Sequence, residues 1–538
     1  MKNLISVVQT MAYAQNRKNR PNHRVLRTEF LEERTLLSAV PLTDAEYLDL
    51  AAQYSALNLP ETREAQNVIT LDLSEGDGLS SLKSAIAEAG TTAKSDLIVV
   101  RTGASVTTGE GDALVTDHSA NTLTYTSASD EITINIDSRA CGSITIVSLG
   151  TALDGTVIPL TLDANTLSRV LTVAGTNTVV NLGGLTITGG TASRGGGINN
   201  AGTLNLSNVI LSKNKASDCG AAIDNAGKAY LYDCISQENS ANWGAGLDSW
   251  GTTVVERCII RDNTATNGGG GINTGGGVLT VSNSLIESNK SSNGGGFRNG
   301  EHGGTQTFTN CVFVDNSATN GGAIYQGGYG GNGISTFLHC TITGNEATTN
   351  GGGIYRNSGT LNLNNSIVTM NYASSYVNVY GVFSATSANN ETTYNPLFVC
   401  GPVFDASGNL TNADALDLHL SSDSPLINSL EDGYIGAYEF TGEPTAAPMD
   451  YSVVTTLDDE FDLTNDVISL REAVWYVSEA DTTITFAESL FTEETPTGTI
   501  LLNSQLYVDK PMTIDGAGRV TLDGQDKTRI IKMSRRWN

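Results

Sequence analysis

The sequence predicts an all-β fold, a right-handed parallel β-helix (solenoid) with a short capping helix. Three observations predict this class: a glycine-rich block recurs about every 25 residues, a column of asparagines keeps the same step, and glycine is abundant while charge is scarce. Glycine supplies 58 of 538 residues and only 16% are charged, which is unlike a helical bundle or coiled coil. A repeat of this length is typical of stacked coils.

The glycine-rich block comes directly before an apolar residue in every repeat. Glycine suits a tight corner in which a Cβ atom would clash, so each block predicts a turn leading into a short strand. The apolar residues that open these strands are Ile198, Ile223, Leu247, Ile272, Phe297, Ile324 and Ile354.

The asparagine column is predicted to be structural. An asparagine tolerates the left-handed turn conformation, and equivalent amides in stacked coils hydrogen-bond to one another. A small residue five positions earlier and a mostly apolar residue three positions earlier share one side of a strand, because side chains alternate with a period of two. The column is Asn214, Asn239, Asn263, Asn289, Asn316, Asn345 and Asn371.

Two or three short strands in each repeat, without a helix between them, cannot bury their apolar side chains alone. Alternating runs such as Thr203 to Leu206 and Thr360 to Leu363 mark these strands. Stacking solves the problem, because each strand then pairs in parallel with its equivalent one coil away, at about 4.8 Å.

The chain is predicted to have five parts. Residues 1 to 39 carry seven basic and three acidic residues, which marks them as a leader. The turns Ser81 to Ile86 and Ser469 to Val474 each precede a β run, as helical lids over the end of a stack would. The parts are an export-associated leader (1–40), an N-terminal cap region (41–105), the β-helix (106–440), a linker (441–450) and the start of a second, truncated β-helix module (451–538).

The charge balance excludes some partners. Thirty basic and 57 acidic residues give a net charge of −27, which repels nucleic acid and anionic membrane surfaces. No run approaches the roughly 18 apolar residues of a transmembrane helix. The oligomeric state is left open.

The cysteines and histidines have no metal-ligand spacing, so no zinc site is expected. Four cysteines share one inward column: Cys234, Cys258, Cys311 and Cys340. Neighbouring pairs would lie near the Cα separation of a disulfide. Small buried residues in a narrow core are the favoured interpretation.

One repeat resembles a known family. Phe313-Val314-Asp315-Asn316, followed by Gly321-Gly322-Ala323-Ile324, is similar to the paired repeats of the polymorphic outer-membrane proteins, and looser versions extend over about 180–375. The resemblance implies a surface-exposed β-helix.

Three further segments resemble parts of exported bacterial proteins. Phe30 to Ala39 is similar to the Leu-Glu-Pro-Arg-x-Leu-Leu segment of planctomycete-type surface proteins, with Glu33 in place of proline. Ser469 to Ala473 resembles the Ser-Leu-Arg-Glu-Ala segment that opens secreted β-helix modules, and Asn395 to Glu439 resembles their closing segment. These resemblances imply a secreted or cell-surface location.

The residue after each strand-opening position is predicted to point outward, which defines the row Asn199, Asp224, Asp248, Asn273, Arg298, Tyr325 and Tyr355. Asp224 and Asp248 are expected about 5 Å apart, one coil from each other. That spacing suits a retaining glycosidase pair or a calcium ion. Apart from calcium at this place, no cofactor is expected. With Arg298 the two aspartates are weak catalytic candidates, and solvated carboxylates on an acidic protein are the favoured interpretation.

Aromatic side chains near this row are candidates for stacking on sugar rings. They are Trp243, Trp250, Tyr325 and Tyr355, although the two tyrosines would also satisfy one another by packing together. We therefore expect a secreted or cell-surface structural, adhesin-like protein that contacts polysaccharide. The alternatives are a polysaccharide lyase or glycoside hydrolase on the same fold, and a degenerate or truncated gene product.

Overall fold

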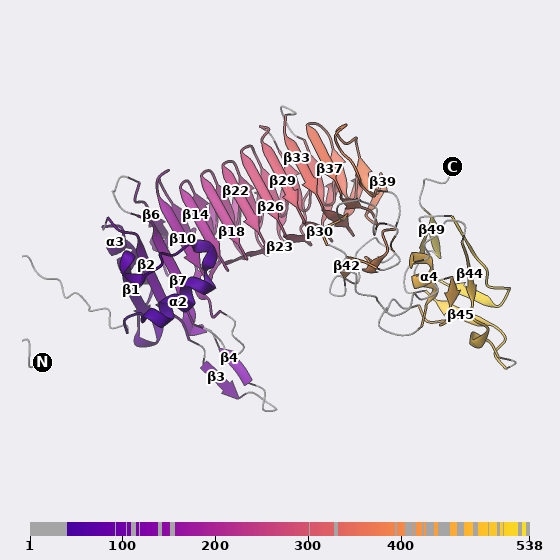
Figure 1. Cartoon of the computed structure of the whole chain (residues 1–538), viewed down its shortest axis with the longest axis horizontal. Coiled ribbons are helices and arrows are strands. Elements are labelled where there is room, and N and C mark those ends of the chain that lie inside the picture. Colours follow the sequence, from indigo (N-terminus) through magenta and orange to yellow (C-terminus); the bar gives the residue numbers. More distant parts are fainter. Residues whose placement is uncertain are drawn as a thin grey trace, which may run out of the picture. The chain divides into compact units, whose positions relative to one another are not determined.

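The fold is a parallel β-solenoid, as the repeats predict (Figure 1). The computed structural model describes residues 40–103 except 92, 105–108, 114–117, 119–137, 142–150, 157–392 except 301 and 328–331, and shorter stretches between 395 and 533. The predicted leader, 1–40, and the linker, 441–450, lie outside these residues except for Val40. Three long sheets, here called sheets I, II and III, run along the solenoid, and a shorter sheet IV lies between sheets II and III in the chain.

Sheet I has 11 strands: β1 (Asn67–Asp72), β2 (Asp96–Arg101), β7 (Ile144–Leu149), β10 (Val179–Gly183), β14 (Thr203–Ser207), β18 (Lys228–Tyr232), β22 (Thr252–Glu256), β26 (Val278–Ser282), β29 (Thr305–Thr309), β33 (Ile334–Leu338) and β37 (Thr360–Asn364). Sheet II has 10: β5 (Thr122–Thr124), β8 (Leu160–Asp163), β11 (Leu185–Thr188), β15 (Ile210–Ser212), β19 (Ile235–Gln237), β23 (Ile259–Arg261), β27 (Leu285–Glu287), β30 (Val312–Val314), β34 (Thr341–Thr343) and β38 (Ile367–Val368).

Sheet III also has 10 strands: β6 (Ile132–Ile134), β9 (Leu171–Val173), β13 (Ile198–Asn200), β17 (Ile223–Asn225), β21 (Leu247–Ser249), β25 (Ile272–Thr274), β28 (Phe297–Asn299), β32 (Ile324–Gln326), β36 (Ile354–Arg356) and β40 (Val379–Tyr380). Sheet IV has two parts: β12 (Thr191–Arg194), β16 (Lys215–Cys219), β20 (Ser240–Trp243) and β24 (Thr264–Gly268), then β31 (Ser317–Asn320), β35 (Glu346–Asn350) and β39 (Tyr372–Ser375). A hairpin of β3 (Ser105–Thr108) and β4 (Leu114–Asp117) follows β2.

Left-handed residues make the corners of each coil. In one coil Asn208, Lys213 and Gly220 have φ of 55°, 56° and 62°. The residue in the left-handed region is thus the one before each ladder asparagine, rather than the asparagine itself as the sequence suggested. The reason is that the asparagine side chain must point inward to meet its neighbours. At Gly220 a Cβ would lie 2.4 Å from the carbonyl oxygen of Ile223, so this corner requires glycine.

One cluster of buried side chains fills the solenoid, with aliphatic residues such as Ile198, Leu204 and Leu211 in the early coils. Farther along, aromatic rings take their place. Phe308 and Phe337 stack with ring centroids 4.9 Å apart. Because neighbouring coils place equivalent side chains at strand spacing, identical residues meet face to face.

Two helices lie near the N-terminal end of the solenoid (Figure 1). Helix α3 (Leu79–Ala89) lies between β1 and β2 in the chain, where later coils have strands of sheets II and III, and its Leu82 and Ile86 join the solenoid core. Helix α2 (Asp44–Gln53) and the following Tyr54 pack on the outer face of sheet I, against Leu97 and Val99. Sheet I therefore begins inside the region predicted as a cap.

At the other end, a returning segment packs on the outer face of sheet II. Strands β41 (Phe398–Cys400) and β42 (Asp417–Leu420) are antiparallel, and Phe398 and Ile435 form a buried cluster with Val314 and Ile367. The Gly436 N–H donates to the Asn365 carbonyl at 2.9 Å. The predicted closing segment thus makes lateral contacts with the last coils.

The C-terminal segment has its own buried core. Strands β43 (Val453–Val454), β44 (Thr482–Phe486) and β47 (Met512–Ile514) pair in parallel, as do β45 (Gly498–Leu501) with β48 (Val520–Asp523) and β46 (Leu506–Val508) with β49 (Ile531–Met533). Helix α4 (Leu470–Tyr476) opens on the Ser-Leu-Arg-Glu-Ala segment. The Ser469 N–H donates to Glu472 at 2.7 Å, the Glu472 N–H donates to the Ser469 hydroxyl at 3.1 Å, and Arg471 pairs with Asp459 at 2.8 Å. The motif is thus a capping box with an ion pair.

The inward cysteine column is a hydrogen-bonded row of free thiols and hydroxyls. The Cys234 N–H donates to the Cys258 Sγ at 3.3 Å, and the Cys258 N–H donates to the Ser284 Oγ at 3.1 Å. The Cys258 thiol in turn donates to the Glu256 carbonyl at 3.3 Å. From Cys234 to Ser366 this column holds only cysteine and serine, small side chains that can both accept and donate a hydrogen bond, whereas the first coil has Val209 in the same place.

We expect Cys258→Ala to lower the free energy of unfolding by about 1–3 kcal/mol, because it leaves the buried Cys234 N–H without its acceptor. The matched variant Cys258→Ser keeps both hydrogen bonds and should cost clearly less. Urea unfolding of the full chain, followed by circular dichroism, measures the difference. Equal losses in the two variants would show that thiol volume, and not hydrogen bonding, selects the residue.

Candidate functional site

The outward row of sheet III is the candidate site, and most of it is buried. The register pairs Asn199 with Asp224, Asp224 with Asp248, Asp248 with Asn273 and Asn273 with Arg298. Asp224, Asp248, Asn273 and Arg298, here called the polar row, are 4%, 0%, 4% and 7% exposed. The expectation of solvated carboxylates is therefore wrong for this row.

Sheet IV explains the burial of the polar row. A left-handed residue, glycine after every strand of sheet IV except β39, turns the chain back, so the last side chains of sheet IV lie over the outer face of sheet III. Arg194, at the end of β12, contacts Asp224 by two hydrogen bonds of 2.9 and 3.0 Å. The Nη2 atom of the same Arg194 guanidinium also lies 3.8 Å from the Oδ2 atom of Asp248. One guanidinium thus serves both carboxylates.

Asp248 is fully enclosed and each of its oxygens is used. Its Oδ1 accepts from the Asn273 amide at 2.6 Å, and its Oδ2 accepts from the Trp250 indole N–H at 2.7 Å. Burial raises the pKa of Asp248 to about 6, against the opposing effect of the Asn273 hydrogen bond. A carboxyl sealed in this way stabilises its neighbours and offers no path for a sugar to reach it.

Arg298 closes the far end of the polar row. Its guanidinium donates to the Asn273 Oδ1 at 2.9 Å and lies 4.5 Å from the centre of the Trp243 ring. Gly268 makes this stacking geometrically feasible, because a Cβ there would lie 2.4 Å from the Arg298 Cδ. Trp243, predicted to bind a ligand, is therefore engaged in a cation–π contact inside the protein.

Trp250 is the exposed member of the predicted aromatic set, with 36% of its surface accessible. Its ring packs directly against the backbone of Gly275, where a Cβ atom would be 2.3 Å from the ring carbon Cζ2. The exposed His302 ring lies beside it, with centroids 5.6 Å apart and planes at 44°. Together with the hydrogen bond to Asp248, these contacts hold the indole in one orientation.

The tyrosines form a stack along the solenoid. Tyr325 and Tyr355 lie 5.2 Å apart at 15°, and Tyr355 and Tyr380 lie 4.5 Å apart at 5°. Both faces of the Tyr355 ring are consequently covered by other rings. Of the two interpretations that the sequence left open, the geometry matches mutual packing, because stacking on a sugar needs a free ring face.

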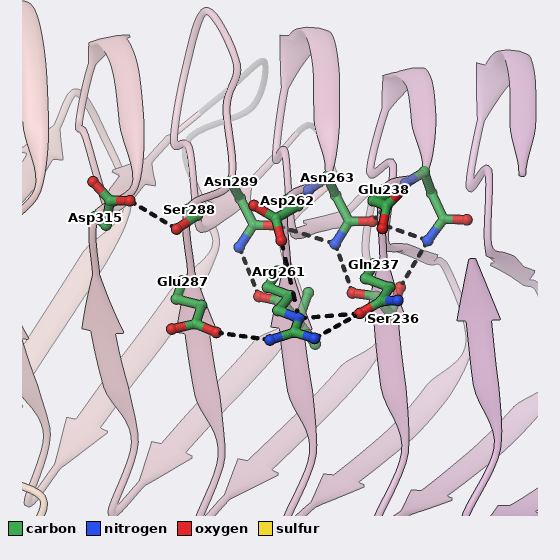
Figure 2. Close-up of polar contacts among 12 residues, drawn as sticks. Ser236, Gln237, Glu238, Arg261, Asp262, Asn263, Glu287, Ser288, Asn289 and Asp315 are labelled. Atoms are coloured by element: carbon green, nitrogen blue, oxygen red, sulfur yellow. Dashed lines mark hydrogen bonds and ion pairs between the residues drawn. The ribbon is translucent and has the colours of Figure 1, made fainter. Parts of the chain in front are cut away.

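The seven ladder asparagines are all buried and form one column. Figure 2 shows Asn263 and Asn289 of this column. In the coil of Asn263, the Oδ1 accepts the Asn239 N–H at 3.1 Å and the Asn239 amide at 2.9 Å. The Asn263 amide donates to the Ser236 carbonyl at 2.9 Å and to the Asn289 Oδ1 at 3.0 Å. All four hydrogen-bonding positions are filled, which leaves no group for a ligand.

Beside this ladder, a more exposed row lies along sheet II (Figure 2). Arg261 donates to the Gln237 Oε1 at 3.0 Å and lies 3.9 Å from the Glu287 carboxylate. Such solvated pairs contribute little stability.

Sequence reasoning missed two features of the site. Arg194 stands 30 residues from Asp224, outside the repeat column, so no spacing connects it to the polar row. A second internal ladder lies between sheets III and I, where the Asn200 amide donates to the Asn225 Oδ1 at 2.7 Å and the Asn225 amide donates to the Thr253 hydroxyl at 2.8 Å. The polar residue two positions after each strand-opening residue was the available signal for it.

Within the described part of the chain, no group of three or more His, Cys, Asp or Glu side chains is arranged to hold a metal ion. In the same residues, no helix has the length and apolar character needed to cross a membrane.

The chain folds as a parallel β-solenoid, and two of its coils are similar to the repeats of polymorphic membrane proteins. The model of the Chlamydia polymorphic membrane protein repeat matches residues 310–327 and 339–355, two successive coils. The first match contains the Phe313 and Gly321 blocks on which the resemblance was based. No curated protein and no solved structure matches the chain.

Proposed function

We propose that the chain is a secreted or cell-surface scaffold of adhesin type, which contacts polysaccharide through Trp250 and His302. The repeats at 310–327 and 339–355 support a surface location, since their family is that of polymorphic membrane proteins. A long solenoid with asparagine ladders and a continuous core is stiff and uniform, as a scaffold requires.

The fixed, exposed Trp250 ring is the observation that carries the polysaccharide contact. Its indole N–H is held by Asp248 and one side of its ring lies on Gly275, so binding a sugar would cost little side-chain entropy. The exposed His302 offers a hydrogen-bonding group next to the ring. Because the chain carries a net charge of −27, the glycan proposed is an uncharged one.

We expect the full chain to bind neutral polysaccharides such as xylan or laminarin in affinity electrophoresis, and Trp250→Ala to weaken that binding about tenfold or more, because the platform is lost. His302→Ala should weaken binding without touching the Asp248 hydrogen bond. The control is Tyr376→Ala, an exposed aromatic residue elsewhere with 59% of its surface accessible.

Three results would count against the proposal. They are no retardation by any neutral glycan, unchanged retardation in Trp250→Ala and His302→Ala, or an equal loss in the Tyr376 control. Preferential binding of polygalacturonate or alginate would contradict the choice of an uncharged glycan.

A further inference from the structure

The first strand of sheet III has one unpaired edge. Among the described residues β6 pairs only with β9: the Ile132 N–H donates to the Val170 carbonyl at 3.1 Å, and the Ile134 carbonyl accepts the Ala174 N–H at 2.9 Å. In a strand, successive residues direct their N–H and C=O groups to opposite edges. The backbone groups of Thr133 therefore face away from β9, and its side chain is exposed.

A cavity of about 390 Å³ runs along this unpaired edge, between β6 and helix α3. Lys83, Ile86 and Ala87 line it from the helix, and Thr133 and Ile134 line it from the strand. The cavity exists because α3 stands where the preceding coil would place a strand of sheet III. A helix is about 10 Å wide and has no free edge, so it cannot approach β6 to the 4.8 Å of a paired strand.

The lining of the cavity suits one apolar side chain and an extended backbone. Ile86 and Ile134 are buried members of the solenoid core and form its apolar wall. At its rim Glu131 pairs with Arg169 at 2.9 Å, and Lys83 pairs with Asp130 at 3.3 Å. Because these rim charges are paired with one another, the electrostatic attraction of a partner comes from the whole chain. Its net charge of −27 attracts cationic segments.

We propose that the groove between α3 and β6, here called the edge groove, binds an extended, cationic segment of a partner polypeptide as an added strand of sheet III. The added strand donates to the Thr133 carbonyl and accepts from the Thr133 N–H, continuing the parallel pattern that joins β6 to β9. Its apolar side chain enters the space beside Ile86 and Ile134. This mode of recognition takes affinity from the main chain and specificity from alternate side chains. An uncovered edge of this kind is otherwise a site of uncontrolled association, which proteins normally block.

The test uses the full chain and a C-terminally amidated heptapeptide that copies Arg169 to Gly175 and is labelled with tetramethylrhodamine, a dye of no net charge. This sequence already pairs with β6 on its other edge and carries one positive charge. We expect saturable binding in fluorescence anisotropy. Thr133→Pro removes the N–H at the unpaired edge and spares the hydrogen bonds of Ile132 and Ile134, so it should weaken binding about tenfold while the fold is retained. Ala87→Trp should abolish binding by filling the groove.

The matched control lies on β5, the terminal strand of sheet II. The Tyr125 N–H donates to the Asp163 carbonyl, so the Thr124 N–H faces the unpaired edge of β5. Thr124→Pro should therefore leave peptide binding unchanged. Equal affinities for all variants, or no binding, would overturn the proposal. So would slow hydrogen exchange of the Thr133 amide in the isolated monomer, which would place another segment of this chain in the groove. A dimer that Thr133→Pro dissociates would assign the groove to a second copy.

Discussion

Replacing Asn263 with alanine should destabilise the solenoid by about 3–5 kcal/mol, the larger of two effects expected here. The substitution removes two hydrogen bonds that the Asn263 Oδ1 accepts and two that its amide donates. The Asn239 N–H then remains buried without an acceptor. A surface hydrogen bond would cost far less, because water replaces the lost partner.

Urea unfolding of the full chain, with hydrogen exchange of the neighbouring coils, measures this effect. The control is Asn267→Ala on the same coil, whose half-buried side chain lies outside the ladder and should change stability by less than about 0.5 kcal/mol. Faster exchange should be confined to amides near the Asn239 and Asn289 coils, since each coil contacts only its neighbours. Similar midpoints for the two variants would mean that the ladder contributes nothing specific.

The second large effect is a dependence of stability on pH that originates at Asp248. Burial raises its pKa in the folded chain to about 6 from 3.8, so the folded state holds a proton that the unfolded state releases. Its stabilising contribution is complete below about pH 4 and is lost as the pH rises through 6. The difference amounts to about 3 kcal/mol.

Comparing the full chain with Asp248→Asn between pH 4 and pH 7.5 isolates this contribution, because the variant does not titrate there. We expect the stability difference between the two proteins to shift by up to about 3 kcal/mol in favour of the native protein at the acidic end. Glu46 acts in the opposite direction at lower pH, because its hydrogen bond with Arg101 lowers its pKa to about 2. A constant difference across the range would show that Asp248 is not the titrating group.

Much of the fold follows from residue spacing. A strand in a solenoid pairs with its equivalent one period away, so the contacts that define the fold are encoded in the repeat itself. The pairing of Ile198 with Ile223, and of Asn214 with Asn239, could therefore be predicted from their offsets. The corner residue was assigned wrongly, to Asn214 instead of Lys213, because the ladder and the left-handed turn occupy adjacent positions.

The candidate site could be predicted only in part. The polar row was found, yet its burial was missed, because an outward residue looks the same in the sequence whether solvent or sheet IV covers it. The contact of Arg298 with Trp243 depends on Gly268, because a Cβ atom at that position would overlap the Arg298 side chain. A glycine in the sequence does not indicate which side chain packs against it.

The sequence by itself determined the coil, its period and the ladder, since these need only a residue type repeated at a fixed distance. The tertiary structure alone decided which polar groups reach solvent. That outcome depends on where the glycine corner directs sheet IV, and it separates the enclosed Asp248 from the exposed Trp250 two residues later. It also decided that α3 takes the place of a strand, so that among the described residues β6 keeps an unpaired edge, which no local pattern of residues marks.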